Sequence, residues 1–241
     1  MQAGLYVALS AQVALDRRLT AIATNIANQS TPGYRAEEVD FKALVSRTGD
    51  TPVAYVSRGT SHISQAPGAT IKTDNPLDVA VQGSGWLALQ TPAGTVYTRD
   101  GRMLMQANGA LQSINGYPVL DAGNSPIAVD PLGGPVTIAQ DGMISQNGAQ
   151  IGAIGLFSLD PTAELRRFDN SSVTASKPAT PILDFNNNGI TQGFIEGSNV
   201  NPLIEMEKLI LLSRSFEEIS SSIENSENSL KDAIKILGGA A

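Results

Sequence analysis

The sequence predicts an α+β fold with long N- and C-terminal helices of the coiled-coil type, an inserted antiparallel β domain and an extended connecting arm. Two observations predict this fold. Apolar residues recur at alternating steps of three and four at both ends of the chain, and tight-turn dipeptides recur at short intervals between those ends. We therefore expect an N-terminal helix, an arm, a β domain and a C-terminal helix over residues 1–34, 35–75, 76–198 and 199–241.

The apolar repeats indicate helices that pack against other long helices, whereas an ordinary helix of a globular domain usually carries a wider apolar stripe. The C-terminal helix is expected from about Pro202 to Leu237, roughly 54 Å at 1.5 Å per residue, which exceeds the diameter of a small domain. The two helices cannot cover both stripes alone, so we expect other copies or other chains to cover the rest. The predicted assembly seam consists of Leu5, Leu15, Leu19, Ile22, Ile26, Leu209, Leu212, Phe216, Ile219, Ile223, Leu230 and Leu237.

Signals at the helix ends support these boundaries. Asn28 and the Ser-Thr-Pro-Gly string at 30–33 stop the first helix, because proline lacks the backbone N–H and biases its predecessor away from helical angles. Asn201 is suited to cap the second helix and Pro202 to its first position. Gly238 and Gly239 end that helix.

Between the helices the pattern changes to short apolar runs separated by turns, which is typical of hairpins. The turn dipeptides are Asp100-Gly101, Asn108-Gly109, Asn115-Gly116, Asp141-Gly142 and Asn147-Gly148. Residues 35–75 show no sustained helical period and predict an extended connector with some strand.

Composition excludes several classes of function. Lys and Arg total 16 against 23 Asp and Glu, a net charge of −7, so we expect neither nucleic acid nor an anionic membrane as a partner. The chain has no cysteine and one histidine, His62, which excludes thiolate metal sites and any mechanism with two imidazoles. We expect no enzyme activity, no catalytic residue, no metal, no cofactor and no small-molecule substrate.

Membrane and secretion signals are also missing from the sequence. No apolar run approaches the about 18 residues of a membrane span, so we expect no membrane insertion. The N-terminal segment does not match a cleavable secretory signal. We expect any passage out of the cytoplasm to use a route without one.

Two segments partly match the sequence motifs of known binding sites. Residues 184–189 match the first six positions of an EF-hand calcium loop, but position twelve is Ile195 rather than a bidentate glutamate, so we expect a turn between two strands. The Gly-Ser-Gly string at 83–85 lacks the third glycine and the helix of a phosphate-binding loop, so we expect a bend or bulge. His62 is expected to be a surface residue rather than a general base.

Four segments resemble the flagellar basal-body rod and hook family. They are NIANQSTPGYR at 25–35, TDNPLDVA with GSGW between 73 and 86, YTRDG with GYPVL between 97 and 120, and EGSNVN with Glu205 and Met206 between 196 and 206. The family motif residues are Asn25, Asn28, Pro32, Gly33, Tyr34, Asn75, Pro76, Leu77, Asp78, Trp86, Glu196, Ser198, Asn199 and Asn201.

The resemblance implies an axial structural subunit of the bacterial flagellum that polymerises through its terminal helices around the export channel and transmits torque in motility. It implies a place in the basal-body rod in the periplasmic space, export uncleaved through the flagellar type III apparatus, and copies of itself and other rod proteins as partners. The length and the Gly-Trp-Leu-Ala-Leu-Gln run are most similar to the proximal rod branch. The distal rod branch is the alternative, and a secreted coiled-coil adhesin is a weaker one.

Overall fold

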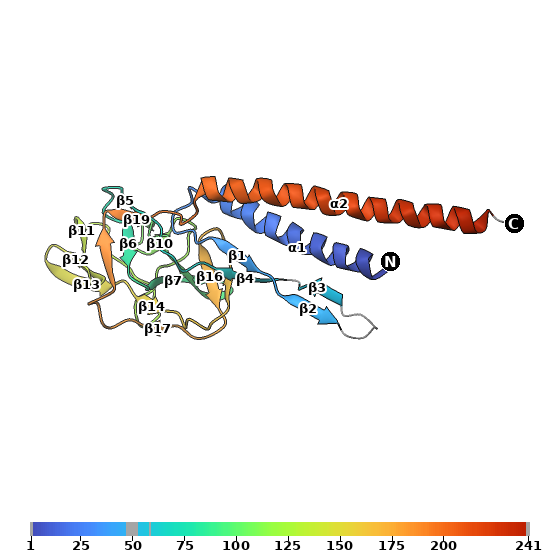
Figure 1. Ribbon diagram of the computed structural model, residues 1–241. Coiled ribbons are helices and arrows are strands. Elements are labelled where there is room, and N and C mark those ends of the chain that lie inside the picture. The colour runs from blue at the N-terminus through green and yellow to red at the C-terminus, as the bar shows by residue number, and fades with distance from the viewer. Residues whose placement is uncertain (1, 47–52, 58, 240–241) are drawn as a thin grey trace. The chain divides into compact units, whose positions relative to one another are not determined.

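The computed structural model describes residues 2–46, 53–57 and 59–239 (Figure 1). Helix α1 (Gln2–Ala27) lies near the N-terminus, helix α2 (Pro202–Gly238) near the C-terminus, and short strands lie between them. The chain forms two compact units. The first contains the helices with residues 37–62, and the second contains residues 28–36 and 63–200. Neither described helix is long and apolar enough to span a bilayer.

The prediction of long coiled-coil helices around an inserted domain is wrong. The described residues form a mostly β chain with one helix towards each end, and no coiled coil is shown among them. Heptad spacing specifies an apolar stripe on a helix but not the partner that covers it. Helix α1 packs against α2 within the first unit, but α1 has 26 residues and α2 has 37. The last turns of α2 therefore face no helix of the described chain.

The ends of α2 follow from local chemistry. The Asn201 side chain accepts hydrogen bonds from the backbone N–H groups of Leu203 and Ile204, which confirms the predicted N-cap. Pro202 occupies the first turn, where a missing N–H costs nothing. Glu205 near the start and Lys235 near the end complement the helix dipole.

The segment predicted as an extended connector with some strand contains five short paired strands. Strand β1 pairs with β4, β2 pairs antiparallel with β3, and β5 pairs with β19. The partner of β5 lies far along the chain, and no local period reveals such a partner. The strands are β1 (Glu37–Asp40), β2 (Ala43–Ser46), β3 (Val53–Val56), β4 (Thr60–Ile63) and β5 (Thr70–Lys72).

A six-stranded sheet with the order β15-β16-β8-β7-β14-β17 organises the second unit. Its central strand β7 is buried on both faces, because Leu87 and Leu89 enter one apolar cluster while Trp86 and Ala88 point to the other side. The sheet consists of β7 (Trp86–Thr91), β8 (Gly94–Thr98), β14 (Leu156–Ser158), β15 (Leu165–Arg167), β16 (Ser172–Ala175) and β17 (Thr180–Pro181).

Smaller antiparallel sheets complete the second unit. Strand β18 pairs with β6, β9 with β10, and β12 lies between β11 and β13. Residues from all these sheets contribute to the main apolar cluster, which makes the unit one packed body. The strands are β6 (Val79–Gln82), β9 (Met103–Met105), β10 (Leu111–Ser113), β11 (Val136–Ile138), β12 (Met143–Gln146), β13 (Ala149–Ala153), β18 (Gly189–Gln192) and β19 (Phe194–Glu196).

Most of the predicted turns are present in the second unit. Asn147-Gly148 joins β12 to β13 with both residues at positive φ, as a type I′ hairpin requires. Gly109, Gly116 and Gly142 also have positive φ. The dipeptide Asp100-Gly101 does not form a hairpin turn, because the strands on either side of it, β8 and β9, belong to different sheets.

Candidate functional site

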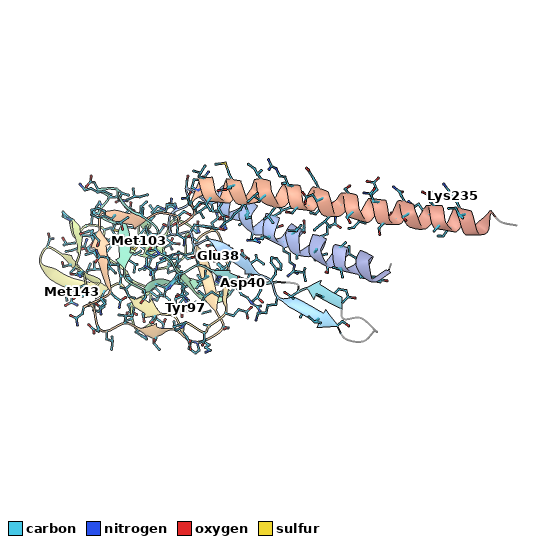
Figure 2. All side chains as sticks on the ribbon, in the orientation of Figure 1. Glu38, Asp40, Tyr97, Met103, Met143 and Lys235 are labelled. Atoms are coloured by element: carbon cyan, nitrogen blue, oxygen red, sulfur yellow. The ribbon has the colours of Figure 1, made fainter. Side chains whose placement is uncertain are left out.

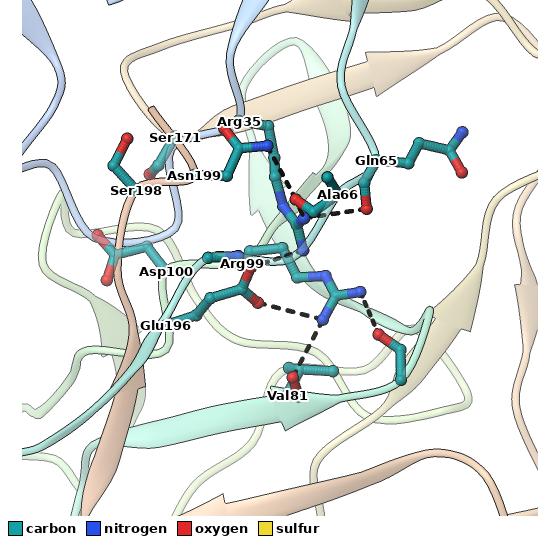
Figure 3. Close-up of polar contacts among 12 residues, drawn as sticks. Arg35, Gln65, Ala66, Val81, Arg99, Asp100, Ser171, Glu196, Ser198 and Asn199 are labelled. Carbon is teal, nitrogen blue, oxygen red and sulfur yellow. Dashed lines mark hydrogen bonds and ion pairs between the residues drawn. The ribbon is translucent and has the colours of Figure 1, made fainter. Parts of the chain in front are cut away.

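Three of the sequence motifs meet in a buried ionic cluster of the second unit (Figure 3). Glu196, at the end of β19, places one carboxylate oxygen 2.6 Å from Nη2 of Arg35 and the other 3.3 Å from Nη1 of Arg99. Arg35 belongs to the N-terminal motif and Arg99 follows β8. All three residues are at most 3% exposed, so this is a fully enclosed pair of cations around one anion.

Backbone carbonyls surround the two guanidinium groups. Arg35 Nη1 donates to the carbonyl oxygens of Gln65 and Ala66 (Figure 3). Arg99 donates to the carbonyl of Val81 at 3.1 Å and to that of Gly83 at 2.6 Å. The Nε atoms of both arginines are buried without a hydrogen-bond partner. The cluster therefore carries a net positive charge that carbonyl dipoles compensate only in part.

Burial shifts the titration of both arginines. Desolvation lowers the pKa of Arg99 to about 10, and the Glu196 carboxylate acts against this shift while Arg35 adds to it. The pKa of Arg35 is also lowered by desolvation, again opposed by Glu196. Both groups stay charged at neutral pH, so the single carboxylate has to offset two buried cations.

Trp86 lies beside the cluster and is the one tryptophan of the chain. The Cζ atoms of Arg35 and Arg99 lie 5.9 Å and 5.4 Å from its ring centroid, within cation–π range. Tyr34 is fully buried, and Arg167 Cζ lies 4.2 Å from its ring. Two aromatic residues of the family motifs, Tyr34 and Trp86, thus lie against arginines.

The backbone around the cluster joins the two ends of the second unit. Gly33 N donates to the carbonyl of Glu196 at 2.8 Å, and Asn199 N donates to the carbonyl of Tyr34 at 3.2 Å. The Asn199 side chain accepts from Ala36 N and donates to the carbonyl of Ala66. The segments 33–36 and 196–199, at opposite ends of this unit's sequence, therefore lie side by side.

A second polar cluster lies within the first unit. Asn25, near the end of α1, is buried and exchanges two 2.9 Å hydrogen bonds with the backbone of Glu37. Its amide also donates to the carboxylate of Glu205 on α2 at 3.2 Å. Lys208 pairs with the same carboxylate at 2.6 Å. This cluster fixes the end of α1 to the start of α2 and to strand β1.

The other motif residues form local turns in the second unit. Asn28 Oδ1 accepts from the hydroxyl of Thr31, which closes the turn after α1 that contains Pro32. Asn75 donates to the carboxylate of Asp78 and accepts from Leu77 N, so the motif around Pro76 is a closed turn before β6. Ser198 accepts from Val200 N.

The predicted seam residues differ in exposure. Ile22 and Leu212 are buried. Leu15, Leu19, Ile26, Leu209, Phe216, Ile219 and Ile223 are half-buried. The side chains of Leu5, Leu230 and Leu237 lie outside the described ones. The assembly of chains through this seam stays a prediction.

The described residues offer little for catalysis or metal binding. His62 is half-exposed and lies 3.4 Å from the carboxylate of Glu38 and 3.5 Å from that of Asp40, two residues of β1 (Figure 2). The two carboxylates approach different ring nitrogens, and no group of three or more possible metal ligands occurs in the described part of the chain. The loop at 184–189 connects β17 and β18, which belong to different sheets, and Asp184 accepts a bond from Asn186 N.

The predicted motif set missed the two arginines and Glu205. Arg35, Arg99 and Glu205 all lie within or next to the quoted motif segments, but a charged residue is ordinarily expected on the surface. The sequence offered one signal for these three residues, which is that each stands within or next to a quoted motif segment. Burial itself was not visible in the sequence.

Three family descriptions match the chain in order. Residues 5–35 match the flagella basal body rod protein, 80–146 the flagellar hook protein FlgE/F/G D1 domain, and 191–236 the flagellar basal body rod FlgEFG protein C-terminal region. Flagellar basal-body rod protein FlgF of Mesorhizobium japonicum is 48% identical over 99% of both chains, and that of Rhizobium meliloti is 45% identical over 100% of both. FlgG of Bacillus subtilis is 29% identical over 98% of this chain and 99% of its own.

The chain therefore belongs to the family of flagellar basal-body rod proteins, which confirms the predicted resemblance. It is a structural subunit of the rod of the bacterial flagellum. The chain is more similar to these two relatives called FlgF than to that FlgG, which fits the main prediction rather than its alternative.

Proposed function

We propose that the chain is an axial subunit that polymerises through α1 and α2 around a central export channel and so transmits torque along the rod. The observation that carries this proposal is the exposure of apolar side chains on both helices. Soluble helices usually expose charged and polar residues on the face away from their core. Large apolar side chains exposed in such number mark a surface that another chain covers.

The first third of α2 is apolar around most of its circumference. Leu203, Ile210 and Leu211 are 73%, 54% and 56% exposed, while Leu212 on another side of the helix is buried. A helix that is apolar all round is stable in water only when it is enclosed. We therefore assign residues 203–211 to an interior layer of the polymer.

Helix α1 carries a corresponding exposed stripe. Tyr6, Leu9 and Val13 are separated by three and four residues, and each is at least 45% exposed. This spacing places their side chains on one face over two turns. The stripe is suited to pack against a helix of a neighbouring copy or of another rod protein.

The proposed partners are copies of this chain, other rod proteins and the flagellar type III export apparatus. The proposed location is the rod segment in the periplasmic space. Full-length similarity to relatives named basal-body rod proteins supports this placement.

The experiment is to replace Ile210 or Ile219 with Asp in a strain whose only copy is the variant. A charge within a buried helix interface costs several kcal/mol at every repeat. Because Ile210 is 54% exposed in the single chain, Ile210→Asp should leave the melting temperature of the purified chain unchanged while swimming is lost. Cryo-electron microscopy of isolated basal bodies should place the parent chain in the rod and show no such density for the variant.

Ser221→Asp is the matched control, because this position of α2 is exposed and polar. It should preserve both swimming and rod density. Normal swimming by Ile210→Asp and Ile219→Asp cells would contradict the proposal.

A further inference from the structure

We propose that the Arg35–Glu196–Arg99 cluster makes folding of the second unit depend on its last segment, residues 189–199. The unit crosses its folding barrier only when Glu196 has entered the cluster. Until that segment is present, the preceding strands do not form a stable folded body. This inference concerns the single chain and holds independently of the proposed polymerisation.

The charge balance of the interior is the first argument. Among the described residues, Glu196 supplies the carboxylate that pairs with both buried guanidinium groups. A folded body without it would enclose two cations compensated only by carbonyl dipoles. Enclosing an unpaired charge is strongly unfavourable, and two like charges that share one site also repel each other.

The backbone connections of the same segment are the second argument. Strand β18 pairs with β6 and β19 with β5, so the last two strands of the unit complete its first two. Gly68 N donates to the Glu196 carboxylate across 128 residues of sequence, and Ala36 N donates to Asn199 across 163. Closing such long loops costs entropy before the contacts they permit are gained.

The order in which the chain is synthesised determines when these contacts can form. The arginines and the carbonyls that bind them precede residue 100, whereas Glu196 is the last charge of the unit to be made. A growing or partly delivered chain therefore has the cationic part of the interior without its counter-charge. Folding waits for the C-terminal segment rather than beginning with the first strands.

Trp86 provides a direct probe of this step. It is the one tryptophan, and both arginines of the cluster lie against its ring, so its fluorescence reports closure of the cluster. We would follow refolding and unfolding of the full chain by stopped-flow fluorescence and by far-ultraviolet circular dichroism. In the parent chain both signals should change at the same rate, because strand formation and cluster closure belong to one barrier.

Glu196→Gln keeps the shape of the side chain and removes its charge. We expect the folding rate to fall about tenfold or more and the unfolding rate to change less than about threefold, since the lost interaction is already made at the barrier. Glu164→Gln, at an exposed ion pair with Arg166, should leave both rates within about twofold. In the Glu196→Gln background, Arg99→Met removes one buried cation and should recover part of the folding rate.

Glu196→Asp retains the charge on a shorter side chain and is the second variant if Glu196→Gln does not fold. It should also fold more slowly than the parent. The proposal is overturned if Trp86 fluorescence lags behind strand formation in the parent chain. It is equally overturned if the variants fold at the parent rate and only unfold faster, because the cluster would then close after the barrier.

Discussion

Gly33 shows at residue scale how closely the family motif packs. Its φ of 68° lies in the left-handed region, and a Cβ at this position would overlap the backbone nitrogen of Asp100. Gly116 has a similar φ of 82°, but nothing lies within 4 Å of the Cβ it would carry. A comparison of substitutions at the two glycines therefore separates the free-energy cost of a positive φ from the cost of overlap with a neighbouring backbone.

We expect Gly33→Ala to destabilise the second unit by about 3 kcal/mol or more, because strain at positive φ adds to a backbone overlap that cannot relax. Gly116→Ala should cost only about 1 kcal/mol, the conformational part alone. Denaturant unfolding followed by Trp86 fluorescence measures both free energies of unfolding. Equal losses in the two variants would show that the chain around Gly33 moves aside.

The sequence was sufficient to predict the structural role of residues that act on backbone groups close to them in the chain. Asn201 and the turn at Asn147 and Gly148 act on backbone groups within a few positions, so their chemistry is visible in a short window. The pairing of Arg35 with Glu196 spans most of the chain. Nothing in either neighbourhood specifies that both side chains are buried together.

At the scale of elements, α2 depends on its cap as well as on its packing. The Asn201 side chain satisfies two N–H groups that the first turn leaves without helical partners. We expect Asn201→Ala to lower the free energy of unfolding of the first unit by about 1 kcal/mol. Thermal unfolding followed by the helical circular dichroism signal measures the loss.

Asn201→Asp is the control for that measurement. It retains the acceptor and places a negative charge at the positive end of the helix dipole, so it should preserve stability or increase it slightly. A loss in Asn201→Asp equal to that in Asn201→Ala would contradict the capping role.

Strands β1 to β5 show why the pairing within the predicted connector could not be read from the sequence. Each has three or four residues, too few for a clear alternating pattern, and β5 pairs with a strand more than a hundred residues away. The coiled-coil prediction failed for a related reason. A seven-residue repeat describes the surface of one helix, and the partner of the distal part of α2 is not encoded in that repeat.

At the scale of the whole molecule, the two units differ in how much of their apolar surface is covered within a single chain. The second unit has a continuous apolar cluster, whereas Ile234 and Ile236 near the end of α2 are 70% and 75% exposed. In a dilute solution of the full chain, we expect amide hydrogens of α2 beyond about residue 224 to exchange much faster than those of β7 and β8. Hydrogen–deuterium exchange with mass spectrometry measures this difference.

Helix α1 provides the internal reference, because Ala14, Ala21 and Ile22 are buried and should slow exchange in its second half. If the amide hydrogens at the end of α2 were protected from exchange as strongly as those of β7, contacts within a single chain would already stabilise the whole helix.

The adjacency of Tyr34 and Asn199 bears on how this architecture can vary in size. The second unit consists of residues 28–36 and 63–200, and its segments at 34–36, 66 and 199 are held together by backbone and amide hydrogen bonds. The part of the chain between Ala66 and Glu196 lies within this unit, so it can lengthen or shorten without moving the place where the chain re-emerges. The second unit is in this sense a module whose size is independent of the place of its junction.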